Sequence, residues 1–68
     1  MIRRSRRRWV ELDVNAPAHT PVMSTVSREV GDYFGIGADG RAVVRFDGDA
    51  PGVVDYIDPA TLLQAVEK

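Results

Sequence analysis

The chain has 68 residues, one histidine and no cysteine, and its nine basic and ten acidic residues give a net charge of −1. A chain this short forms one small domain at most. Without cysteine it has neither a disulfide nor a thiolate metal site, and a single histidine argues against a histidine-based zinc site. Because small cores usually need further support, we expect a homo-oligomer, either a homodimer or a part of a larger host assembly.

Five of the nine basic residues form one run: Arg3, Arg4, Arg6, Arg7 and Arg8. Residues 9–68 hold four basic residues against ten acidic ones, a net charge of −6. Like charges in a run repel one another and gain little by folding. We therefore expect residues 1–8 to form a flexible basic arm ahead of a single β-rich domain over residues 9–68.

No apolar run approaches the roughly 20 residues that a helix needs to cross a bilayer. Residues 5–10 have the outline of a twin-arginine export signal, but Glu11 and Asp13 interrupt the apolar segment that such a signal requires. We therefore expect a cytoplasmic protein with no membrane partner.

Residues 6–14 alternate in polarity, with Val10, Leu12 and Val14 on one side of the chain. This period of two predicts a half-buried strand. Residues 15–21 contain two prolines and predict a loop.

Residues 22–36 allow two interpretations, since their apolar residues recur at helical spacing while Gly31 disfavours a helix. We expect a short strand over residues 22–26 and a short helix from Ser27 to Phe34. Thr25 or Ser27 would cap this helix, and Gly35 would end it.

The second half of the chain has clearer turn and boundary signals. Residues 41–46 predict a strand with Ala42, Val44 and Phe46 on its core face, and residues 53–57 predict an antiparallel strand after a turn. Asp58 and Pro59 are typical of a helix start. We expect a short C-terminal helix that buries three apolar residues: Leu62, Leu63 and Val66.

These elements predict a mostly-β domain, a small partly open β-barrel of four to five short strands with a short central helix and a short C-terminal helix. A single sheet of this size must curl or pair with another chain to cover its apolar face.

The chain has few residues suited to catalysis. His19 and the hydroxyls of Ser24, Thr25 and Ser27 are the candidates, but His19 lies between two prolines in a predicted loop. A nucleophile needs a base that is held within hydrogen-bond reach and oriented by a third group. We therefore expect a protein that is not an enzyme.

Two further patterns suggest ligands and are rejected. Asp47, Asp49, Asp55 and Asp58 are hard-cation ligand types, but they lack the spacing of a calcium loop and suit hairpin turns. Gly35, Gly37 and Gly40 match a dinucleotide fingerprint in outline, without the βαβ unit that it requires. We expect no cofactor and no metal.

The candidate binding residues are the arginine run and the tryptophan after it: Arg3, Arg4, Arg6, Arg7, Arg8 and Trp9. Arginines can neutralise phosphates, and Trp9 can either stack on a base or cover the end of the domain. The acidic body disfavours duplex DNA beyond the reach of the arm. An acidic surface on a neighbouring copy or on another protein is the alternative partner.

Two families share local patterns with this chain. Residues 27–30, then Phe34-Gly35-Ile36 and residues 38–44, resemble the swapped-hairpin DNA-binding fold of AbrB-type regulators and antitoxins (residues 27–46). That resemblance implies an intertwined homodimer. Residues 39–47, residues 53–57 and residues 58–62 are similar to Tudor-like small β-barrels (residues 39–62), which implies a docking module for proteins or nucleic acids.

The sequence thus favours a small non-enzymatic binding module, a regulatory nucleic-acid-binding protein of the kind used in transcription regulation, with an arginine-rich arm. The alternative is a protein–protein interaction module or accessory subunit that docks its basic arm on an acidic partner.

Overall fold

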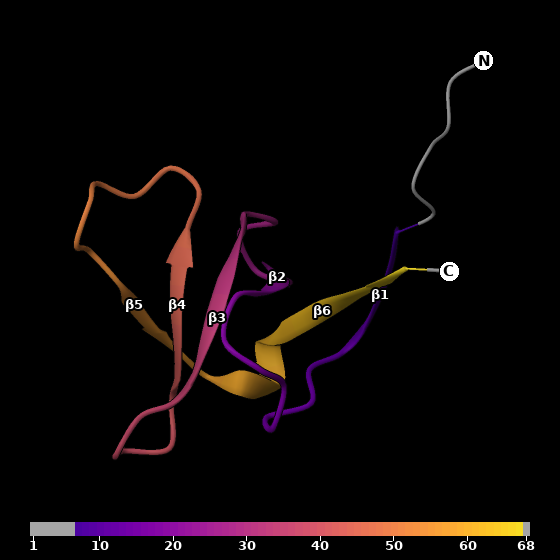
Figure 1. The fold of residues 1–68 in the computed structure, drawn as a ribbon, viewed down its shortest axis with the longest axis horizontal. Helices are drawn as coiled ribbons and strands as arrows, with labels where there is room; N and C mark the ends of the chain where they lie inside the picture. The colour runs from indigo at the N-terminus through magenta and orange to yellow at the C-terminus, as the bar shows by residue number, and fades with distance from the viewer. Residues whose placement is uncertain (1–6, 68) are drawn as a thin grey trace.

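The structure, a computed structural model, describes residues 7–67, which form one antiparallel sheet of six strands (Figure 1). The strands are β1 (Arg7–Glu11), β2 (Thr20–Ser24), β3 (Val30–Ile36), β4 (Ala42–Phe46), β5 (Asp55–Ile57) and β6 (Leu62–Glu67). A single 3-10 turn, η1 (Pro59–Thr61), precedes β6. Within this described range no helix is long and apolar enough to cross a membrane.

The strand order is β1-β6-β2-β3-β4-β5, so the last strand lies between the first two. β2, β3, β4 and β5 follow one another as hairpins, whereas β1 pairs with β6 from Arg7↔Glu67 to Glu11↔Leu63. Only Leu62–Gln64 of β6 pair with β2. The outer part of β6 therefore runs on with β1 alone, away from β3, β4 and β5 (Figure 1).

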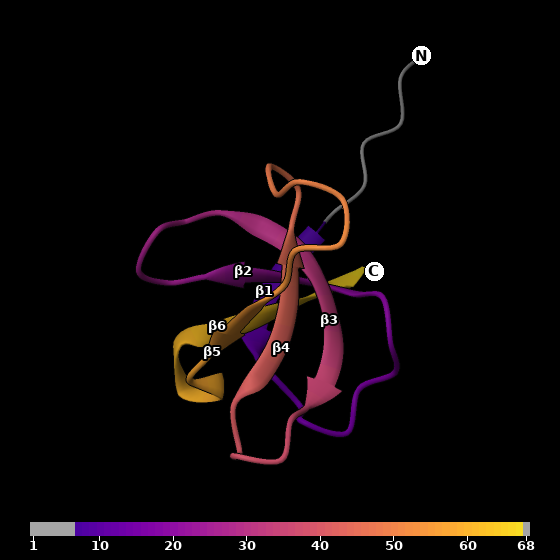
Figure 2. The same cartoon turned by 90° about the vertical axis from the view of Figure 1, so that its left-hand side faces the viewer.

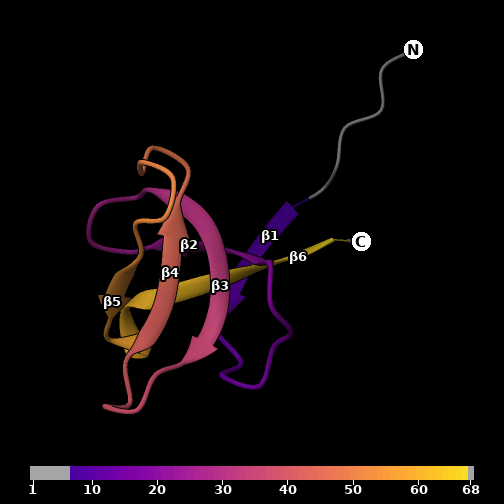
Figure 3. The ribbon, with the colours of Figure 1, turned by 60° about the vertical axis from the view of Figure 1, so that its left-hand side comes forward.

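The core lies on one face of this coiled sheet. In the views of Figures 2 and 3, β6 runs across the direction of β4. The buried apolar residues are Val22, Tyr33, Ala42, Val44, Phe46 and Leu62. Leu12, Ala16 and Ile57 pack against them from the edges. Because side chains alternate across a strand, β4 buries the three residues that its sequence pattern predicts, and that prediction is confirmed.

The predicted helix from Ser27 to Phe34 is wrong. Residues 25–27 form a turn and Val30–Ile36 form β3, whose burial follows a period of two rather than a helical period. Gly31 explains part of this outcome, because a Cβ there would lie 2.6 Å from the Cα of Phe46 and closer still to the Arg45 carbonyl oxygen. The glycine that disfavours a helix is thus the residue that lets β3 and β4 approach each other.

The predicted C-terminal helix is also wrong, although its start signal acts as expected. Asp58 Oδ1 accepts a hydrogen bond from the Ala60 N–H at 3.0 Å, which caps the single turn η1. The chain then becomes extended, since Leu62–Glu67 have strand partners on β1 and β2. Pairing with strands far away in sequence overrides the local helical spacing.

The predicted barrel of four to five strands needs correction as well. The sheet has six strands and is open, with β1 and β5 at its two edges, and these edges do not pair with each other among the strands described. The fold is all-β, without the central and C-terminal helices.

Candidate functional site

The candidate binding residues fall on both sides of the boundary of the described structure. Arg3, Arg4 and Arg6 lie outside the described residues. Arg7, Arg8 and Trp9 lie in β1, where the Arg8 side chain is exposed and the Trp9 side chain is half-buried. The last residues of the arginine run are therefore placed on an edge strand.

The sheet separates Arg8 from Trp9. Neighbouring residues of a strand point to opposite faces, so Arg8 shares one face with Val10 while Trp9 shares the other with Glu11. Trp9 lies opposite Ala65 of β6. Consequently one flat ligand on a single face of β1 cannot both pair with Arg8 and stack on Trp9.

The backbone of β1 alternates in direction as well. The N–H of Leu12 donates to the carbonyl oxygen of Leu62 at 3.4 Å. In an antiparallel pair the hydrogen-bonded positions recur at every second residue. Arg8 and Val10 therefore direct their backbone groups toward β6, and Glu11 directs its own toward the outer side of the sheet.

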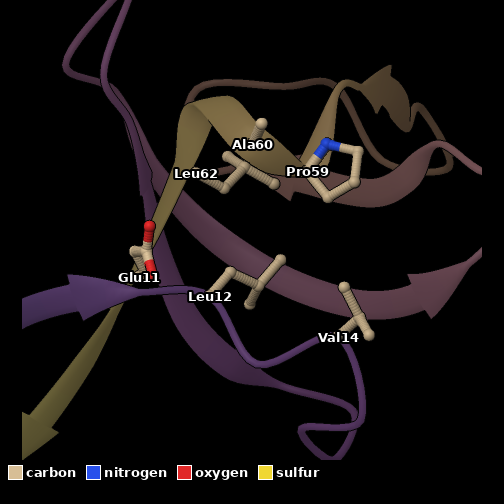
Figure 4. Close-up of a pocket in the computed structure, with 6 residues that line it drawn as sticks. All are labelled: Glu11, Leu12, Val14, Pro59, Ala60 and Leu62. Atoms are coloured by element: carbon tan, nitrogen blue, oxygen red, sulfur yellow. The ribbon is translucent and has the colours of Figure 1, made fainter.

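A hollow of about 300 Å³ opens beside the end of β1. Figure 4 shows Leu12 and Val14 along one wall, facing a wall from the segment around η1, with Glu11 at one end. The residues of the second wall are Pro59, Ala60 and Leu62. The lining is apolar apart from Glu11. This combination suits a peptide ligand with an apolar side chain next to a basic one. Sequence reasoning missed this hollow, because it depends on β6 bringing η1 to the end of β1.

Asp49 stabilises the β4–β5 loop itself. Asp49 Oδ2 accepts a hydrogen bond from the Phe46 N–H at 3.0 Å. Burial raises the pKa of Asp55 above its usual range, and a hydrogen bond with Asp49 and the charges of Asp49 and Glu29 raise it further. Residues 7–67 contain no group of three or more metal-binding side chains that could hold an ion.

The candidates for hydroxyl–histidine catalysis are not brought together. His19 lies before β2. Its ring packs edge-to-face on Phe34 with 5.0 Å between the ring centroids, and its Nδ1 lies 3.9 Å from Asp32 Oδ2. Ser24 lies at the opposite end of β2, where its buried hydroxyl accepts the N–H groups of the turn at 3.1 and 3.2 Å. The two side chains serve separate turns.

The described arginines of the run and the acidic β4–β5 loop lie at opposite edges of the sheet, although β1 also ends in Glu11. Arginines begin and continue β1 at one edge, whereas Asp47, Asp49 and Asp55 lie in or before β5 at the other edge. Compared with protein-family models, with curated proteins and with solved structures, the chain matches none of them. The site must therefore be interpreted from its own geometry.

Proposed function

We propose that this protein is a small nucleic-acid-binding module whose arginine run, residues 3–8, contacts phosphates. The observation that carries the proposal is the place of Arg8, exposed on the edge strand β1. The loop that holds Asp47 and Asp49 leads to β5, the strand farthest from β1 in the sheet order. A polyanion can therefore reach β1 without first meeting that loop.

Phosphate contact is the chemistry that this arrangement supports best. Each arginine that neutralises a phosphate releases condensed counterions, so affinity falls as salt rises. Base stacking on Trp9 is not part of the proposal, because Trp9 is half-buried on the opposite face from Arg8. The proposed binding is consequently insensitive to base sequence. The protein would regulate by covering the nucleic acid that it binds.

The test is a salt titration of binding to a labelled oligonucleotide, single-stranded and duplex. Five substitutions are combined in one variant: R3A, R4A, R6A, R7A and R8A. We expect its affinity to fall and the slope of log K against log salt to flatten by roughly 0.7–0.9 for each phosphate that is no longer neutralised. Wild-type protein that does not bind either oligonucleotide contradicts the proposal.

Arg41 and Arg45 provide the control, since both are exposed arginines outside the run. Arg41 already lies 3.8 Å from Asp39, and Arg45 lies opposite Asp32 in the sheet. The R41A/R45A variant should keep both the affinity and the salt slope of the wild type. If its affinity falls as far as that of the five-fold variant, net charge and not the arginine run controls binding.

The outer edge of β1 favours a second candidate function, docking on an acidic protein surface. Edge strands pair readily with an added strand, and arginines on that edge select acidic partners. Binding to polyglutamate measured beside the oligonucleotide, with the same two variants, separates the two functions. Preference for polyglutamate at equal salt would replace the first proposal by the second.

A further inference from the structure

The two ends of β1 are complementary in charge when two copies of the strand run in opposite directions. The order Arg7-Arg8-Trp9-Val10-Glu11 has a basic residue at one end and an acidic residue at the other. We propose that two copies of this chain pair β1 with β1 in antiparallel fashion about a two-fold axis at Trp9. The two sheets then become one continuous sheet across a homodimer.

The strand order leaves room for this pairing. β1 has β6 on one side, and no other described strand lies on its second side. Because the Leu12 N–H bonds to Leu62 of β6, every second residue of β1 directs its backbone groups toward β6. Positions 7, 9 and 11 therefore direct their backbone groups to the second side. Pairing about Trp9 matches these same positions with one another, so the hydrogen-bonding positions of both copies coincide.

The charges select this register. Pairing about Trp9 places Arg7 opposite Glu11 of the second copy, and by symmetry the same pair forms twice. Opposite charges directly across two strands stabilise the pair, and like charges destabilise it. A shift of two residues in either direction would set Arg7 or Glu11 against Trp9 and shorten the paired segment.

The neighbouring ribbon gives an independent reason for a third strand at this edge. Ala65–Glu67 pair with β1 but not with β2, so this part of the described sheet is only two strands wide. An isolated two-stranded ribbon is marginally stable in water. A second copy of β1 would widen it to four strands in the order β6, β1, β1, β6.

The other edge of the sheet does not share this property. β5 has only three residues, Asp55–Ile57, and pairing it with itself about Tyr56 would set Asp55 against Ile57. The same approach would bring two acidic β4–β5 loops together. The self-complementary edge is β1, and this inference holds whether or not the arginine run binds nucleic acid.

Sedimentation of the full chain over a wide range of concentration, without nucleic acid, tests the proposal. We expect the wild type to dimerise, and both E11R and R7E to weaken the dimer on the order of tenfold, because two cross-strand pairs become repulsive at once. These charge variants are all made in an E67Q background, because position 7 also lies opposite Glu67 of its own chain. In that background the double variant R7E/E11R restores opposite charges between the two copies and should recover the dissociation constant of the E67Q protein. Circular dichroism confirms that each variant is folded.

Glu29→Arg is the matched control, because Glu29 is exposed and lies in the β2–β3 turn rather than in β1. It changes the net charge as E11R does and should leave the dimer intact. Hydrogen exchange provides a second measurement, in which protection of the Glu11 amide rises with protein concentration. A wild-type monomer at all concentrations, a dimer indifferent to E11R, or a double variant that stays dissociated overturns the proposal.

Discussion

The hydroxyl of Tyr33 donates a hydrogen bond of 2.6 Å to the carbonyl oxygen of Val14. Tyr33 belongs to β3 and is completely buried, whereas Val14 lies in the exposed loop between β1 and β2. The bond thus attaches the loop that follows the arginine-bearing strand to the centre of the sheet. It also satisfies the one polar atom that the largest core side chain carries.

Replacement of Tyr33 by phenylalanine tests how much this hydrogen bond contributes to the free energy of unfolding. Y33F keeps the ring in the core and removes the donor, so we expect the free energy of unfolding to fall by about 1 kcal/mol. Urea unfolding measures the change. Y56F is the control, since Tyr56 is 56% exposed, and it should have almost no effect. An equal decrease in both variants would show that the Tyr33–Val14 bond has no special importance.

The same tyrosine predicts how stability changes at alkaline pH. Burial raises the pKa of Tyr33 above its ordinary value, and the charge of Asp13 raises it further. The unfolded chain therefore releases this proton first. Stability is full below the ordinary tyrosine pKa of about 10 and falls as pH rises from there toward the raised value. Urea unfolding over this range should show a steeper decline for the wild type than for Y33F; parallel declines would contradict the assignment.

The approach of β3 to β4 at Gly31 predicts a large effect of one methyl group. G31A would place a Cβ against the backbone of Arg45 and Phe46, which cannot move aside without breaking the strand pair. We expect the unfolding free energy to fall by about 3 kcal/mol or more. G48A is the control, because a Cβ at Gly48 meets nothing within 4 Å, and surface changes usually stay within about 0.5 kcal/mol. Similar effects at both positions would contradict the close approach.

Because the pKa of Asp55 is raised in the folded chain, we expect this residue to favour the folded state more at acidic pH than at neutral pH. Burial, then the hydrogen bond and charge of Asp49, favour the protonated carboxyl in the folded chain. The stabilisation is therefore present at low pH and is lost as pH rises through the folded pKa. D55N imitates the protonated group, so it should be more stable than the wild type at neutral pH and less dependent on pH. The exposed Asp47 supplies the control variant D47N; a D55N protein that is less stable than the wild type at neutral pH contradicts the prediction.

The sequence predicted β4 and its three core residues because the alternation of Ala42, Val44 and Phe46 fits one structure only. The segment before β4 fits two structures, because Val30, Tyr33 and Phe34 have helical spacing and are also residues that suit a strand. What decides between them is the contact of Gly31 with β4, and that contact is invisible in a local window.

The helix predicted in place of the last strand is wrong for a similar reason. Leu62, Leu63 and Val66 have helical spacing, and only the partners on β1 and β2 make the segment extended. At the candidate site, the sequence proposed the arginine run and Trp9 as binding residues. It could not show that β1 is an edge strand, that Arg8 and Trp9 leave opposite faces, or that Glu11 borders a hollow, because each follows from the sheet order.

The place of β6 between β1 and β2 also sets an order of events during protein synthesis. The hairpins from β2 to β5 can form as each strand leaves the ribosome, since their partners are neighbours in sequence. β1 is made before all of them, yet its partner in the described sheet is made last. Such distant pairing forms slowly. Throughout translation of the first five strands, the arginine-bearing strand β1 therefore stays without its β6 partner in the nascent chain.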